Sequence, residues 1–244
     1  MGPNYRIKPL PILKINVDMG NLTYRMNYGT KIWAGVYSWY IEGGNQPILV
    51  DTAAEASFMR DVKGIPTKEI LSFEDSLAGL GLKPDDISLV IQTHLHYDHC
   101  GHTMKCTNAK VVVQEDELKF ALAPHPMMAN LYVKPFLKGL RFVTVRGPCE
   151  IVPGIELIPA PGHTPGVQAV AVNTTQGRAI ITGFCSIKQN FEPPEELREM
   201  WPVLTPGTMT NGMDAFDSAL RIKGLADILI PQHDPSFADV KSIP

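Results

Sequence analysis

The 244-residue chain has no long apolar run, no cluster of basic residues and no CxxC pair of cysteines. Without an apolar run of about 20 residues, it offers no helix that would span a bilayer. With a net charge of −3 and no basic patch, it gives no reason to expect nucleic acid or a membrane as a partner. The N-terminal residues hold no sustained apolar stretch, so we expect no secretion signal and a cytoplasmic location.

The four cysteines, at 100, 106, 149 and 185, form no CxxC pair and no disulfide framework typical of a small domain. We expect reduced thiols, as in a cytoplasmic protein. The composition, with 44% hydrophobic and 19% charged residues, is that of an ordinary globular protein. No repeat or linker is visible, so residues 1–244 are expected to form one domain, and a homodimer is compatible with the sequence.

Runs rich in β-branched and apolar residues alternate with amphipathic segments along the chain. Strands are expected within 5–17, 33–44, 46–54, 87–92, 110–114, 141–145, 150–160, 167–173, 178–183 and 227–233. Helices are expected within 67–81, with Thr67 as N-cap, and within 115–123 and 211–225. Two halves that are rich in strands and each close with a helix favour an α/β (α+β) fold. Two sheets between helical layers are one such arrangement.

The segment THLHYDHCGH carries the clearest chemical signal. His94, His96, Asp98 and His99 fall within six residues, directly after an apolar strand. Alternation along an extended chain places His94 and His96 on one side. Burying such groups costs free energy unless they are coordinated or paired, and imidazole and carboxylate groups suit Zn²⁺ or a similar divalent ion. The pattern therefore predicts a metal site.

HLHYDH matches the HxHxDH motif, and the chain resembles the metallo-β-lactamase superfamily from about residue 35 to residue 234. APGHTPG at 160–166 and DILIPQHDP at 227–235 resemble the segments that supply later ligands. The motif residues and the Asp that follows His233 are most similar to the N-acyl-homoserine lactonase and pyridoxolactonase branch. The resemblance implies an αββα sandwich and Zn²⁺, as one or two ions, with iron or manganese as alternatives.

The resemblance also implies two ligand sets, His94, His96 and His163 for one metal, and Asp98, His99 and His233 for the other. Enzymes of the branch open a lactone ring with a hydroxide that the metals share. Asp98 would be both a ligand and the catalytic residue that passes a proton to the leaving alkoxide. Asp51, at the end of a strand, is expected to orient a ligand histidine.

The chain departs from the superfamily at Thr182–Ser186. Members carry an aspartate there that bridges both metals, and this chain has no Asp or Glu between Gly177 and Asn190. With Thr182 and Gly183 as anchor, Phe184 occupies the position. Cys185 is a candidate replacement ligand, because a thiolate binds Zn²⁺ or iron well, although a buried, unreactive cysteine is an equally ordinary interpretation.

The pocket is harder to define from the sequence. Residues 124–140 lie where the branch carries an insertion over the active site. The lactonases also have a tyrosine shortly after the bridging aspartate, and this chain does not. Candidate substrate-binding residues are Met128, Tyr132, Phe136, Phe184 and Ser186.

These features predict a metal-dependent hydrolase that opens a lactone or cleaves a related small-molecule ester. One alternative is a thioesterase similar to glyoxalase II. Another is a non-catalytic metal-binding relative that lost turnover together with the bridging aspartate.

Overall fold

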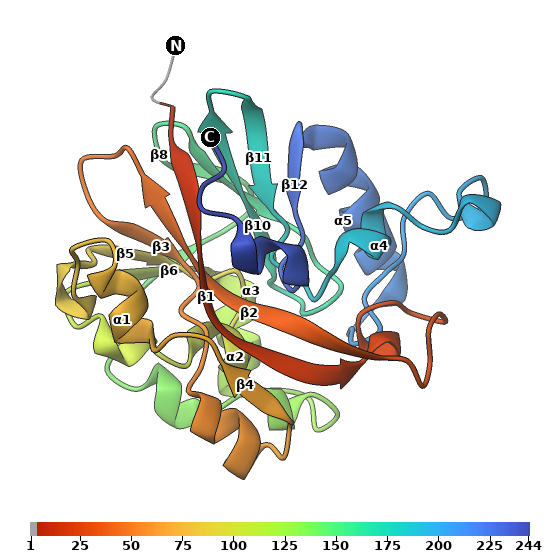
Figure 1. Cartoon of the computed structure of the whole chain (residues 1–244), viewed down its shortest axis with the longest axis horizontal. Coiled ribbons are helices and arrows are strands. Elements are labelled where there is room, and N and C mark those ends of the chain that lie inside the picture. The colour runs from red at the N-terminus through yellow and green to blue at the C-terminus, as the bar shows by residue number, and fades with distance from the viewer. Residues whose placement is uncertain (1–3) are drawn as a thin grey trace.

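The computed structural model describes residues 4–244, so residues 1–3 of the expected domain lie outside the described residues. Two β-sheets lie face to face, and helices cover their outer faces (Figure 1). The first sheet has the strand order β4-β1-β2-β3-β5-β6-β7, and the second has the order β12-β11-β10-β9-β8. The expected αββα sandwich is confirmed.

Each sheet is built from one half of the chain. The first sheet consists of β1 (Arg6–Asp18), β2 (Lys31–Glu42), β3 (Ile48–Val50), β4 (Thr67–Glu69), β5 (Leu89–Ile91), β6 (Lys110–Gln114) and β7 (Arg141–Val145). The second sheet consists of β8 (Cys149–Val152), β9 (Ile155–Pro159), β10 (Gln168–Thr174), β11 (Gly177–Ile181) and β12 (Ile228–Ile230). An isolated bridge between Ile7 and Ile243 places the C-terminus beside β1.

The main core lies between the sheets, and strand alternation decides which residues enter it. In β11, Ala179 and Ile181 join the core between the sheets, whereas Ile180 faces the helical layer. In β2, Trp39 turns inward and Val36 turns outward. Because successive side chains point to opposite faces, each buried strand supplies two separate cores.

The helices close the outer faces. The second sheet is covered by α5 (Gly212–Leu225), whose Ala219 and Ile222 pack in the same cluster as Ile180. The remaining helices are α1 (Phe73–Ala78), α2 (Tyr97–Cys100), α3 (Glu115–Leu122) and α4 (Lys188–Phe191). The expected helices within 115–123 and 211–225 are confirmed as α3 and α5.

The expected helix over 67–81 is wrong in its first half. Thr67 is not an N-cap, because it pairs with Ile15 at the start of the short edge strand β4. Helix α1 begins only after Ser72, whose side chain accepts a hydrogen bond from the Asp75 amide at 3.0 Å. Pairing with β1 satisfies the backbone of 67–69, and this tertiary contact overrides the local helical pattern.

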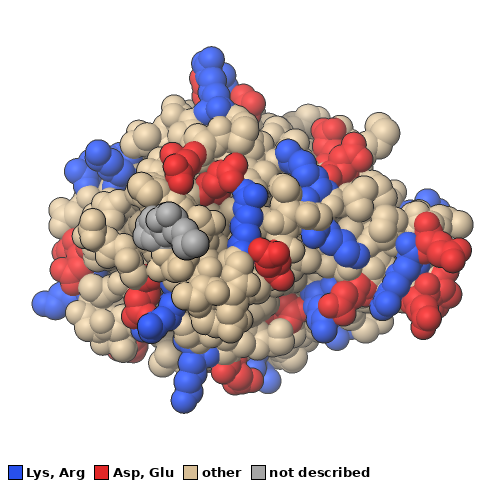
Figure 2. Space-filling model, turned by 90° about the horizontal axis from the view of Figure 1, so that it is seen from above, with Lys and Arg blue, Asp and Glu red and all other residues tan. Residues whose placement is uncertain are grey.

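The surface carries charges of both signs. Basic and acidic side chains are interspersed over the face seen from above (Figure 2). Within residues 4–244, no helix is long and apolar enough to cross a membrane.

Phe184, a candidate substrate-binding residue, lies in the core of the second sheet. Its side chain is 2% exposed and packs with Ile180 and Ala219. Its ring centroid is 6.0 Å from that of Phe191 in α4. The preceding Gly183 has a φ of +77°, and this backbone turn sends the next side chain toward the helices. The structure thus places Phe184 in the core instead of the pocket.

Replacing Phe184 with Ala should therefore reduce stability and leave metal binding intact. Loss of a buried aromatic ring typically lowers the free energy of unfolding by about 3–5 kcal/mol. Denaturant unfolding of F184A and of M127A, whose Met127 is 81% exposed, would measure this effect. Wild-type stability combined with lost substrate binding in F184A would contradict the core assignment.

Candidate metal centre

The polar residues of the site lie where strands of both sheets end. Asp51 follows β3, and His94 and His96 follow β5. Helix α2 carries Asp98 and His99. The same region receives His163 from the loop between β9 and β10, and His233 from the segment after β12. Residues far apart in sequence thus converge because their strands end at one edge of the sandwich.

The structure forms two groups from these residues. His94, His96 and His163 form one, and Asp98, His99 and His233 form the other. Within each group the candidate ligand atoms all lie within 4.8 Å of one another. The five histidines are at most 3% exposed. These are the two ligand sets that the resemblance implied, brought together from three separate segments of the chain.

Hydrogen bonds orient three of the imidazole rings. The Nδ1 atom of His163 donates to the Thr208 carbonyl at 2.5 Å, and that of His233 donates to the Gly35 carbonyl at 2.8 Å. The Nδ1 atom of His99 donates to the Asp51 carboxylate at 2.8 Å. With the proton on Nδ1, each ring presents the lone pair of Nε2 as a metal ligand.

Burial keeps most of these rings neutral. It lowers the pKa of His94 and His96 well below the usual value, and that of His163 to about 4. Burial opposes protonation of His99 too, but the charges of Asp98 and Asp51 outweigh it and raise the pKa of His99. Neutral imidazoles are the form that binds metals, and binding would displace the remaining proton.

The donor set fits a divalent metal. The Nε2 atoms of His94 and His163 lie 3.3 Å apart, and the Nε2 atom of His96 is buried without a hydrogen-bond partner. Because the His163 proton lies on Nδ1, its Nε2 lone pair faces His94 Nε2, and a cation between the two nitrogens would serve the lone pairs of both rings. A borderline ion that accepts imidazole and carboxylate ligands meets this requirement.

Comparison with known proteins agrees with this geometry. A family model described as the metallo-β-lactamase superfamily matches residues 32–233. The chain belongs to the metallo-β-lactamase superfamily. An N-acyl homoserine lactonase of Bacillus thuringiensis is 29% identical over 197 residues, which are 75% of this chain and 77% of the relative. The lactonase AttM of Agrobacterium fabrum is 26% identical over 183 residues, which cover 70% and 67% of the two chains.

Solved structures show the same likeness over the whole fold. A quorum-quenching N-acyl homoserine lactone lactonase superposes with a TM-score of 0.79 at 26% identity, covering 98% of this chain and 95% of its own. An N-acyl homoserine lactone hydrolase with N-hexanoyl-L-homoserine bound at its catalytic metal centre has a TM-score of 0.78 at 25% identity. That match covers 97% of this chain and 95% of the other.

Asp51 is the centre of a buried hydrogen-bond network. It is fully buried and accepts hydrogen bonds from the Thr93 amide and hydroxyl, the His99 ring and the Gln232 amide, at 2.7–2.8 Å. Its φ of +56° is rare for a residue with a side chain, and such strain is found at functional sites. Its bond to His99 agrees with the expectation that Asp51 orients a ligand histidine.

Residues 182–186, where the resemblance implies a bridging aspartate, contain no carboxylate. Cys185 is the residue of this segment that lines the site. A cavity of about 140 Å³ is bounded by Cys185 and by the candidate ligands other than His94. The Cys185 Sγ atom lies outside both ligand groups and is 4.0 Å from the Asn21 carbonyl. Burial, and next the Asp98 charge, raise the pKa of the thiol, so Cys185 stays protonated unless a cation lies beside it.

The other candidate substrate-binding residues do not line this cavity. Ser186 is fully buried, and its hydroxyl is bonded to Thr182 and to the Phe184 carbonyl. Met128 and Tyr132 are buried in a small core, and Phe136 packs against that core and against Phe58. The Tyr132 ring stacks edge-on against His96 at 4.8 Å, with its hydroxyl turned toward Glu117.

Several cavity residues were not expected from the sequence. They come from β1, α2 and neighbouring loops, namely Ile15, Val17, Asn21, Leu22, Ile65, Tyr97 and Thr208. Ala34 of β2 and Leu131 of the segment 124–140 expected over the site also line the cavity. The others carry no local signal, because residues of the same type elsewhere in these strands fill the core.

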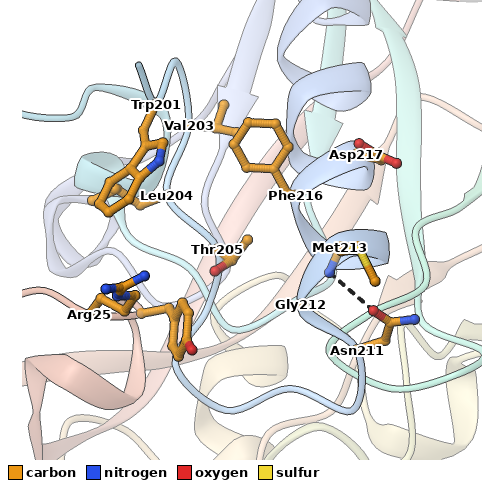
Figure 3. A pocket seen from close by; sticks show the side chains of 11 residues that line it. Arg25, Trp201, Val203, Leu204, Thr205, Asn211, Gly212, Met213, Phe216 and Asp217 are labelled. Carbon is orange, nitrogen blue, oxygen red and sulfur yellow. Dashed lines mark hydrogen bonds between the residues drawn. The ribbon is translucent and has the colours of Figure 1, made fainter. Parts of the chain in front are cut away.

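Figure 3 shows a second cavity, of about 580 Å³. Trp201 and Phe216 face it, and the Arg25 guanidinium lies 5.9 Å from the centroid of the Trp201 ring. Both cavities use the same two segments as walls. Residues 21–22 and 208 line the first, whereas 24–25 and 203–205 line the second.

The remaining histidines lie outside both ligand groups. His102 is buried and stacks on Phe73 with ring centroids 4.9 Å apart. His125 is exposed, and its Nδ1 accepts a hydrogen bond from the Met127 amide at 3.2 Å.

Replacing Asp51 with Asn should weaken metal binding by about 10–100-fold, because outer hydrogen-bond partners set the tautomer and orientation of ligand histidines. The amide oxygen of Asn can still accept one bond, but the charge that holds the His99 ring is lost. Chelator competition would measure the affinity, with D61N as the control because Asp61 is exposed and lies outside the site. Equal affinities in D51N and wild type would contradict this role.

Proposed function

We propose that the chain is a metal-dependent hydrolase that opens a lactone ring or cleaves a related carboxylic ester, with Zn²⁺ as its metal. The observation that carries the proposal is the pair of ligand groups, with three of their rings already oriented, at the wall of a cavity. The N-acyl homoserine lactonases among its relatives support an oxygen ester as substrate. A cytoplasmic location and a homodimer remain predictions.

The six candidate ligands would form two metal sites. His94, His96 and His163 would hold one ion, and Asp98, His99 and His233 the other. Divalent ions bound there would polarise the ester carbonyl and acidify a water molecule. The apolar side chains of Ile15, Leu22 and Leu131 would limit the access of further water to the reacting ester.

Asp98 is the proposed catalytic residue. It is the least buried of the six, at 16% exposure, and it lines the cavity. Its Oδ2 atom lies 3.6 Å from His99 Nε2 and 3.9 Å from His233 Nε2. From this position its carboxylate would take the proton of the attacking water and deliver it to the leaving alkoxide oxygen.

Cys185 is proposed to complete the second site in place of the bridging aspartate. Its side chain lines the cavity, whereas those of Phe184 and Ser186 do not. A nearby divalent ion would favour the thiolate, which is a strong ligand for Zn²⁺.

The metal content should be near two ions per chain in wild type and near one in C185A. Mass spectrometry of protein purified without added metal would measure it. C149A is the matched control, since Cys149 is also half-buried but lies in β8 of the second sheet. One ion in both wild type and C185A would mean a mononuclear site and an unreactive Cys185.

Replacing His96 with Ala should abolish lactone hydrolysis, with a decrease in kcat/KM of at least about 100-fold, because one ion loses a ligand. H125A is the control, since His125 lies outside both groups. The assay would compare N-acyl homoserine lactones with a linear thioester.

Preference for the thioester would favour the thioesterase alternative. Metal-loaded wild type that hydrolyses neither substrate would favour a non-catalytic relative. Hydrolysis that persists after the metal has been stripped would overturn the proposal.

A further inference from the structure

Glu117, in the first turn of α3, is a buried carboxylate with no basic partner. Its side chain is fully buried. Within residues 4–244 it forms no salt bridge with Lys or Arg. Burying an unpaired carboxylate costs several kcal/mol unless hydrogen bonds or a nearby cation compensate for it. The burial of the Glu117 carboxylate therefore requires compensating interactions.

The groups that bond to Glu117 all lie next to proposed metal ligands. The Leu95 amide, between His94 and His96, donates to its Oε1 atom at 2.9 Å. The Thr164 hydroxyl, next to His163, donates to its Oε2 atom at 2.5 Å.

The third donor comes from the segment over the site. The Tyr132 hydroxyl donates to Glu117 Oε1 at 3.1 Å, and its ring packs edge-on against His96. One carboxylate thus bonds to both segments that carry the first ligand group and to the side chain packed on one of its rings.

The packing around Glu117 leaves little freedom. A Cβ atom added to Gly166 would lie 2.0 Å from the Glu117 amide nitrogen, so α3 touches the loop that carries His163. Burial raises the pKa of Glu117, and the three donors and the Gly166 amide act in the opposite direction, favouring the ionised form. The negative charge of Glu117 also acts on His99, whose pKa it helps to raise.

We propose that Glu117 is a positioning residue for the His94, His96 and His163 site. It holds the two ligand-bearing segments in register and supplies negative charge that balances bound divalent metal. A metal ion is the cation that the buried carboxylate otherwise lacks. This inference rests on the proposed metal site, and it assigns no contact between Glu117 and substrate or metal.

The test separates positioning from a general contribution to folding. Glu117→Gln keeps the size of the side chain and can still accept hydrogen bonds, but it removes the charge. Thr164→Val and Tyr132→Phe keep the charge, and each removes one of its donors. Asp116→Asn is the matched control, because Asp116 is exposed on the same helix and loses the same charge.

Zn²⁺ affinity would be measured by competition with a chromophoric chelator, and Tm with and without Zn²⁺. We expect E117Q to bind Zn²⁺ about 10–100-fold more weakly, as for other groups that support metal ligands. Every tenfold loss removes about 1.4 kcal/mol of the stabilisation by saturating metal, so the increase in Tm on adding Zn²⁺ should shrink. D116N should match wild type. T164V and Y132F should each lose several-fold, and they test the proposal even if E117Q does not fold.

Wild-type Zn²⁺ affinity in E117Q, or in both T164V and Y132F, would overturn the proposal. So would an equal fall in Tm with and without Zn²⁺, since that result indicates a purely structural role. Failure of wild type itself to bind Zn²⁺ would instead contradict the proposed function, so the two ideas fail in different ways.

Discussion

The rest of the structure depends on the cost of removing a cluster of imidazoles and carboxylates from water. Five histidines and Asp51 are almost fully buried around one small cavity. Such groups are stable inside a protein only if their lone pairs and charges have partners. The outward-facing nitrogens of three rings bond to Thr208, Gly35 and Asp51, whereas the inward-facing lone pairs converge. The converging lone pairs therefore still need a partner, which a divalent cation would supply.

The packing of the two sheets brings the site residues together. Each sheet is held by apolar strands whose alternating side chains fill separate cores, and the chemistry is confined to the ends of those strands. Asp51, Glu117 and the Thr208 carbonyl hold the ends in place from outside the ligand groups. A site of this kind is as rigid as its supporting contacts, which is why residues that touch no metal can control how strongly it is bound.

The chain has no Asp or Glu between Gly177 and Asn190, where the resemblance to the lactonases implies a bridging carboxylate. The backbone at Gly183 turns so that Phe184 enters the core of the second sheet and Cys185 lines the cavity. The change is therefore local, because both groups of three ligands remain in place. The site therefore has a thiol in place of a carboxylate, and the charge of that thiol depends on a nearby cation.

The sequence by itself determined most of the strands, the helices at 115–123 and 211–225 and the histidine motif, because strand alternation and ligand spacing are local properties. The αββα sandwich and the later segments with His163 and His233 followed from the resemblance to the superfamily. The sequence could not determine the first half of the helix expected over 67–81, where pairing with β1 outweighs the local pattern. Nor could it distinguish Phe184 from Cys185 as the residue facing the site, since one backbone turn decides that. The cavity lining and the contacts of Glu117 were set only by tertiary structure. They join residues that lie far apart in the sequence, and their side chains become neighbours only when the two sheets pack together.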